Sequence, residues 1–147
     1  MKYLILVSFC FLISCAQITL EPSDFAWPIE TVLNIDEKGF INESRYSIST
    51  NVIDLFYAET NDSTSFKNES VRLIRDTKGY YYMIASGFKN VYLFSANDGK
   101  FVLTNKFFVS EFGLDLPAFN QRKPNIELLE GEKHLVFIDS NGIKGEE

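Results

Sequence analysis

The chain has 147 residues and a formal net charge of −6, from 14 basic and 20 acidic side chains. An acidic surface argues against binding to nucleic acid and against electrostatic attachment to anionic lipid. Both cysteines, Cys10 and Cys15, lie close to the amino terminus.

The amino-terminal segment has the pattern of a secretory signal peptide. Lys2 gives it a positive start, and residues 3–13 form an almost unbroken apolar run. A bilayer-spanning helix needs about 20 apolar residues, so this run is too short to span a membrane. We therefore expect residues 1–14 to be a helical signal peptide that is removed during export.

The apolar run closes with Leu12-Ile13-Ser14-Cys15, which resembles the lipobox of bacterial lipoprotein precursors. The resemblance implies cleavage between Ser14 and Cys15 and attachment of diacylglycerol to Cys15, which would make membrane lipid a partner of the chain. Two or more acyl chains give stable anchoring, whereas one gives marginal binding. An ordinary signal peptide with a coincidental cysteine and an uncleaved anchor are the alternatives.

The residue after the lipidation position bears on the location. In the usual sorting rule of two-membrane bacteria, an aspartate at this place retains a lipoprotein at the inner membrane, and Ala16 stands there instead. The resemblance thus implies the cell envelope, with the outer membrane favoured and the leaflet open.

After processing, the chain would consist of a lipidated tether, residues 15–24, and a β-rich domain, residues 25–147. Cys10 would leave with the signal peptide and Cys15 would be lipidated, so no disulfide can form within the mature chain. The domain must therefore be stabilised by packing, and aromatic residues make up 15% of the sequence.

Short runs of β-branched and aromatic residues follow one another along this domain, each bounded by Gly, Asn, Asp, Ser or Pro. The best candidate for a helix, residues 52–59, fits either pattern. The sequence predicts an all-β fold, a single antiparallel sandwich or open barrel. The predicted strand runs are residues 31–35, 45–50, 52–57, 71–75, 80–85, 91–95, 101–104, 107–109, 126–129 and 135–139.

Four turns share one design, in which an Asp or Asn precedes a glycine at position 39, 79, 99 or 142. The acidic or amide side chain can bond its own backbone, and the glycine supplies a positive φ. Residues 79–102 resemble the middle of a β-propeller blade. The alternative architecture is therefore a propeller-like partial blade array.

Three segments stand out, two by their apolar pattern and one by its irregularity. Residues 80–85 and 91–94 are apolar on both alternate faces, so we expect them to pair as a hairpin at the centre of the sheet. Residues 116–124 read as the longest irregular loop, and binding often occurs on such loops.

Few residues in the sequence are candidates for catalysis. His134 is the single histidine, and a histidine acts as a general base only beside a nucleophile or an orienting acid. Residues 139–142 resemble the start of a calcium loop but lack the later acidic ligand. Zinc clusters, phosphate loops and nucleophile elbows are absent from the sequence. We expect no catalytic residue, metal or cofactor, and no enzymatic activity.

Five aromatic residues fall in expected turns and loops, and they would either form a binding patch or cover the core; we favour the second. Trp27, Phe112 and Phe119 are the candidate binding residues. The expected function is a non-enzymatic envelope component that binds a protein or polymer. The alternatives are a ligand-sensing or hydrolytic lipoprotein with a loop-borne site and a truncated propeller-like protein. The five aromatics are Trp27, Phe66, Phe88, Phe112 and Phe119.

Overall fold

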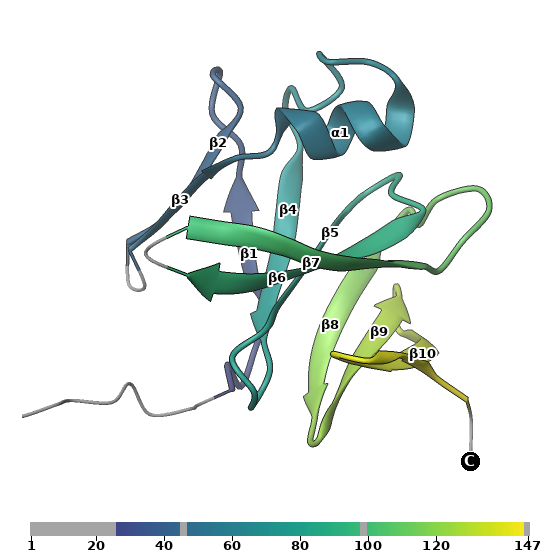
Figure 1. The fold of residues 1–147 in the computed structure, drawn as a ribbon. Coiled ribbons are helices and arrows are strands. Elements are labelled where there is room, and N and C mark those ends of the chain that lie inside the picture. Colours follow the sequence, from purple (N-terminus) through teal and green to yellow (C-terminus); the bar gives the residue numbers. More distant parts are fainter. Residues whose placement is uncertain (1–25, 45–46, 98–99, 146–147) are drawn as a thin grey trace, which may run out of the picture.

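The computed structural model describes residues 26–44, 47–97 and 100–145. In this part of the chain antiparallel strands predominate, with one short helix, α1 (Ile53–Thr60), so the all-β prediction is confirmed (Figure 1). The predicted signal peptide and tether lie outside the described residues. The strands are β1 (Thr31–Asn34), β2 (Phe40–Glu43), β3 (Ile48–Asn51), β4 (Ser70–Arg75), β5 (Tyr81–Ala85), β6 (Asn90–Asn97), β7 (Lys100–Phe108), β8 (Pro117–Arg122), β9 (Asn125–Glu130), β10 (Lys133–Asp139) and β11 (Gly142–Lys144).

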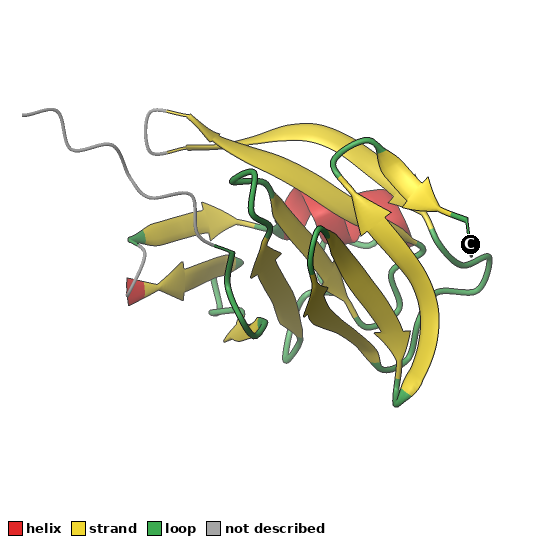
Figure 2. Cartoon of the chain, turned by 90° about the horizontal axis from the view of Figure 1, so that it is seen from below, coloured by secondary structure: helices red, strands yellow, loops and turns green. Residues whose placement is uncertain are grey.

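The described strands form three antiparallel sheets. A five-stranded sheet has the order β1-β4-β5-β6-β7, a four-stranded sheet the order β11-β10-β9-β8, and β2 pairs with β3. The two larger sheets pack against one another around a shared core, while the β2–β3 hairpin and α1 lie on the side away from the four-stranded sheet (Figures 1 and 2). None of the described sheets closes into a barrel.

The hairpin of β5 and β6 forms the centre of the five-stranded sheet, as the sequence predicts. Tyr82 pairs with Leu93 in the antiparallel register, and β4 and β7 flank the hairpin on its two sides. Tyr82, Met83, Ile84 and Leu93 are all fully buried. Each such side chain stabilises the fold by about 1.5–3 kcal/mol through its removal from water.

The strand expected over residues 52–57 is wrong, because residues 53–57 belong to α1. The Asn51 side chain accepts a hydrogen bond from the Ile53 backbone N–H at 3.0 Å, which satisfies one donor of the first turn. Asn61 ends the helix with a left-handed φ of 57°. Phe56 is the buried residue of α1, and the half-buried Ile53 and Leu55 pack against the same core.

The irregular loop expected over residues 116–124 is also wrong, because most of it is strand β8. Side chains alternate along this strand, with Pro117 and Phe119 buried and Ala118 and Asn120 less so. β8 pairs with β9 and lies at the edge of its sheet. Proline is tolerated as the first residue of an edge strand, where its missing N–H breaks no ladder bond.

Two of the predicted aspartate–glycine turns have the same geometry. The Asp36 carboxylate accepts backbone N–H bonds from Lys38 at 2.9 Å and Phe40 at 2.8 Å. Asp76 accepts the equivalent bonds from Lys78 at 2.8 Å and Tyr80 at 2.9 Å. The glycines that close these turns have φ of 81° and 89°, as the turn design requires.

Candidate functional site

Phe112 is the most exposed large apolar residue of the described chain, with 93% of its surface accessible. It lies in the connection between β7 and β8, residues 109–116. Phe108 at the end of β7 is 58% exposed, and Leu116 at the end of the connection is 66% exposed. Exposed large apolar side chains that follow one another along one stretch of the chain are candidates for an interaction site.

The connection that presents Phe112 is tied to the turn between β5 and β6. The Gly87 N–H donates to the Leu114 carbonyl at 2.7 Å, and the Leu114 N–H donates to the Phe88 carbonyl at 3.1 Å. The Ser86 hydroxyl donates to the Asp115 carbonyl at 2.8 Å. Leu114 itself is buried. The backbone on the carboxyl side of Phe112 is therefore fixed to the central hairpin.

A close backbone approach holds the same connection. Gly113 has a φ of +85°, and a Cβ built there would lie 2.4 Å from the Gly87 carbonyl oxygen. Only glycine fits a contact this close with a left-handed backbone. The position of Gly113 therefore requires glycine, although Phe112 beside it is exposed to solvent.

The last residues of the connection are held by the four-stranded sheet. Glu130 in β9 accepts backbone N–H bonds from Asp115 and Leu116, both at 3.1 Å, and the Gly131 N–H donates to the Leu116 carbonyl at 2.8 Å. Both sheets therefore position the connection, and Phe112 projects from a supported backbone. Aromatic anchors held in this way lose little entropy on binding.

The other two candidate binding residues do not lie on this surface. Trp27 is 1% exposed and Phe119 2% exposed, so both belong to the core and their assignment to a binding surface is wrong. Phe66 and Phe88 are buried as well, which agrees with aromatics that cover the core. Ser14 and Cys15 lie outside the described residues.

His134 lies beside an acid, a pairing that the sequence could not reveal. Its Nδ1 is 2.9 Å from a carboxylate oxygen of Glu127, on the neighbouring strand. The other oxygen of Glu127 accepts hydrogen bonds from Arg122 Nε at 3.0 Å and Asn120 Nδ2 at 3.3 Å. The imidazole also packs on the Phe137 ring, with centroids 4.4 Å apart.

The electrostatics of this cluster favour a charged Glu127. Burial raises the pKa of the Glu127 carboxyl, but the hydrogen bonds from His134, Asn120 and Arg122 outweigh burial, and the pKa is lowered overall. A carboxylate can orient a histidine for proton transfer. Within residues 26–44, 47–97 and 100–145, however, no hydroxyl or thiol hydrogen-bonds to His134, so the cluster lacks a paired nucleophile.

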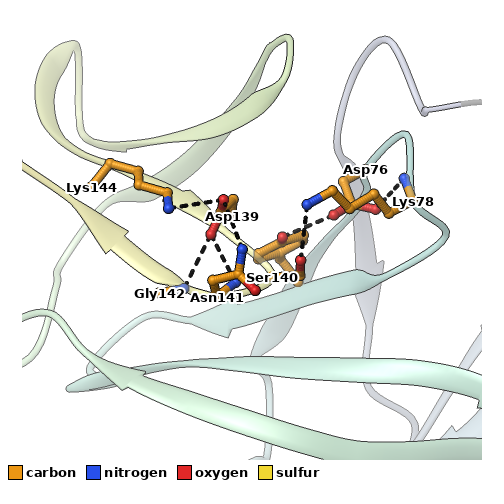
Figure 3. A network of polar contacts seen from close by, with 8 residues as sticks. Asp76, Lys78, Asp139, Ser140, Asn141, Gly142 and Lys144 are labelled. Atoms are coloured by element: carbon orange, nitrogen blue, oxygen red, sulfur yellow. Dashed lines mark hydrogen bonds and ion pairs between the residues drawn. The ribbon is translucent and has the colours of Figure 1, made fainter.

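A second polar cluster joins two aspartate turns from different sheets. Figure 3 shows Lys78, in the turn after β4, reaching Ser140, in the turn after β10, at 3.4 Å. Asp139 accepts hydrogen bonds from Lys144 at 3.0 Å and from the Asn141 N–H at 2.7 Å. Burial raises the pKa of Asp139, but these bonds lower it overall. The turn thus satisfies its own carboxylate.

Metal binding has no further support. In the part of the chain that the structure describes, no group of three or more His, Cys, Asp or Glu side chains is placed to hold a metal ion. Among the same residues, no helix has the length and apolarity to cross a membrane.

Comparison with protein-family models, with curated proteins and with solved structures gives no match.

Proposed function

We propose that the protein is a lipid-anchored, non-enzymatic component of the bacterial cell envelope that binds a protein or polymer partner through Phe112. The lipobox residues Leu12-Ile13-Ser14-Cys15 support the anchor. The single observation that supports the partner site is the 93% exposure of Phe112 on a backbone fixed to both sheets.

The position of the connection fits this role. Figure 1 shows the β7–β8 connection on the right of the molecule and the start of the described chain, before β1, at the lower left. Because Cys15 precedes the described chain in the sequence, an anchor there would leave the β7–β8 connection accessible to a partner. Buried aromatic anchors dominate the energetics of protein interfaces, and Phe112 with Leu116 would fill a pocket of the partner.

Affinity purification of C-terminally tagged protein from gently solubilised native membranes tests the proposal. The bait is expected to carry acylated Cys15 and to bring a reproducible companion. Phe112→Ser is expected to lose that companion, whereas Tyr57→Ser, which removes an aromatic side chain 53% exposed on α1, is expected to keep it.

Each alternative result argues against a different part of the proposal. A companion that survives Phe112→Ser would exclude this connection as the binding site. An acylated bait without a companion would favour a small ligand or a reaction. An unacylated bait that still contains Met1 would exclude the anchor.

The pairing of His134 with Glu127 favours a second candidate, a hydrolytic lipoprotein in which His134 is the general base. Here Glu127 orients the imidazole through Nδ1 and the second ring nitrogen would receive the proton. Hydrolysis of an activated aryl ester that is lost in His134→Gln and reduced in Glu127→Gln would support this candidate. Equal hydrolysis by wild type and both variants would exclude it.

A further inference from the structure

An apolar groove runs between β3 and the β6–β7 hairpin. It consists of two adjoining hollows of about 100 and 180 Å³, and Phe101 of β7 lines both of them. Phe101 packs on Tyr81 with ring centroids 4.8 Å apart and on Phe94 at 5.7 Å. Apolar side chains dominate the walls of the larger hollow: Val52, Leu55, Met83, Phe94 and Leu103.

Both strands beside this groove have an open edge. Among the described strands, β3 pairs with β2 alone and β7 pairs with β6 alone. The second edge of each strand therefore presents backbone N–H and C=O groups that no described strand satisfies. Such edges accept an additional strand, and pockets beside them select its side chains.

The charges at the two ends of the groove differ in sign. Lys100 lines the smaller hollow and Asp54 lines the larger one. Neither side chain has an ion-pair partner among the described residues. A strand that fits this groove would place a carboxylate at the Lys100 end and a basic or amide group at the Asp54 end.

A second copy of the same edge is a poor occupant. β7 carries Lys100 and Lys106 and no acidic residue. Two β7 strands side by side would bring four lysines together, which disfavours edge-to-edge pairing of identical chains. The positive charge of these lysines favours a partner strand that carries negative charge.

We propose that an extended segment of a partner protein adds to the β7 edge and places its apolar side chains in the groove between β3 and β7. The segment alternates apolar and polar residues, with an acidic residue facing Lys100. Because side chains alternate across a strand, Leu103 and Phe101 lie on the face of the sheet that lines the groove, whereas Val102 lies on the opposite face. The groove is distinct from the surface around Phe112, so the two sites can be tested separately.

A displayed library of random peptides, each about ten residues long to match a long strand, provides the probe. The target is the full chain with Cys15→Ala. We expect enriched peptides to alternate apolar residues and to end in Asp or Glu. N-methylation of every second amide is expected to weaken binding about tenfold or more, because it removes backbone bonds, and methylation of the intervening amides is expected to be tolerated.

Matched variants on β7 locate the binding site. Leu103 and Val102 are 51% and 48% exposed, so glutamate is expected to leave either variant folded, as a thermal melt would verify. Leu103→Glu is expected to abolish peptide binding and Val102→Glu to preserve it. Lys100→Glu is expected to reverse the preference from acidic to basic peptide ends, and Phe112→Ser to have no effect.

Four results would overturn the proposal. A lack of enriched peptides, or peptides that bind Leu103→Glu as well as the unchanged chain, would exclude the groove. Binding that is insensitive to N-methylation would exclude strand addition. A dimer in sedimentation that Leu103→Glu dissociates would identify a second copy as the occupant.

Discussion

The phenol of Tyr82 donates a hydrogen bond to the Asp76 carboxylate at 3.0 Å, in a buried environment. The other oxygen of Asp76 accepts the backbone N–H bonds of Lys78 and Tyr80 that close the β4–β5 turn. Burial, together with the nearby Asp76 charge and this bond, raises the pKa of Tyr82 above its ordinary range. One carboxylate thus closes a hairpin and satisfies a core hydroxyl.

Replacing Asp76 should lower the free energy of unfolding more than replacing Asp36, its counterpart in the β1–β2 turn. Asp36→Ala removes turn bonds in an exposed setting and should lower the free energy of unfolding by about 1 kcal/mol. Asp76→Ala also leaves the buried Tyr82 hydroxyl without its acceptor, so we expect a loss of about 2–4 kcal/mol. Urea unfolding of both variants measures the difference.

A double-mutant cycle separates the turn from the phenol. Tyr82→Phe removes the hydroxyl, so Asp76→Ala should cost about 1–2 kcal/mol less in that background than in the wild type. Additive effects of the two substitutions would show that the hydrogen bond contributes nothing to stability.

Glu59 should be a second point of stabilisation, because it holds α1 on the sheet. Its carboxylate accepts hydrogen bonds from the Lys89 N–H at 2.7 Å, from Asn90 Nδ2 at 2.8 Å and from the Tyr92 hydroxyl at 2.7 Å. Glu59→Ala should lower the free energy of unfolding by about 2–3 kcal/mol in urea. Glu132→Ala, which removes an exposed carboxylate, should stay within about 0.5 kcal/mol, and equal losses would contradict this role.

Gly113 should tolerate substitution less well than another glycine with positive φ. Gly131 has a φ of +60° and nothing within 4 Å of a built Cβ, so Gly131→Ala should cost about 1–2 kcal/mol from the backbone alone. Gly113→Ala adds a clash with the Gly87 carbonyl, so we expect about 2–4 kcal/mol. Thermal unfolding measures both, and equal costs would show that the β7–β8 connection moves freely away from Gly87.

Local patterns in the sequence predicted much of the fold, because turns and fully buried strands depend on neighbouring residues. The hairpin of β5 and β6 and the turns at Asp36 and Asp76 are of this kind. The two runs expected at residues 101–104 and 107–109 are one strand, β7, because Asn105 and Lys106 between them also pair with β6, next to a bulge at Thr104. Strand β2, absent from the prediction, is short and depends on pairing with β3.

The remaining differences arise from contacts between distant residues. Residues 52–59 fit strand and helix equally well, and the packing of Phe56 against Phe88, 4.8 Å between centroids, favours the helix. The sequence around Phe112 and Phe119 does not distinguish the two residues. Phe119 is buried because β8 pairs with β9 in a register that places its side chain on the core face. Glu127 and His134 meet only because β9 pairs with β10 in this register, so spacing along the chain gives no signal for the cluster.

This difference between Phe112 and Phe119 can be measured directly. Phe112→Ala should change the free energy of unfolding by less than about 0.5 kcal/mol, because its side chain is 93% exposed. Phe119→Ala should cost about 3–5 kcal/mol, because it opens a cavity in the core. Denaturant unfolding of the two variants tests this, and a large loss in Phe112→Ala would mean that Phe112 packs on the fold.

The Glu127 cluster should make stability depend on pH in the acid range. Because the hydrogen bonds from His134, Asn120 and Arg122 lower the pKa of Glu127 below its ordinary 4.5, the unfolded chain binds more protons than the folded chain at acid pH. The stabilisation is therefore complete above the unfolded pKa and is lost as the pH falls through the folded pKa. Urea unfolding along an acid pH series should show this loss in the wild type.

Glu127→Gln removes the titrating group and keeps a hydrogen-bonding side chain of the same shape. Its free energy of unfolding should fall less steeply below about pH 4.5 than that of the wild type, although Asp139 and Asp62, whose pKa values are also lowered, contribute equally to both proteins. Glu132→Gln is the control, and it should keep the wild-type slope. A Glu127→Gln slope equal to that of the wild type would show that the cluster does not stabilise the charged carboxylate.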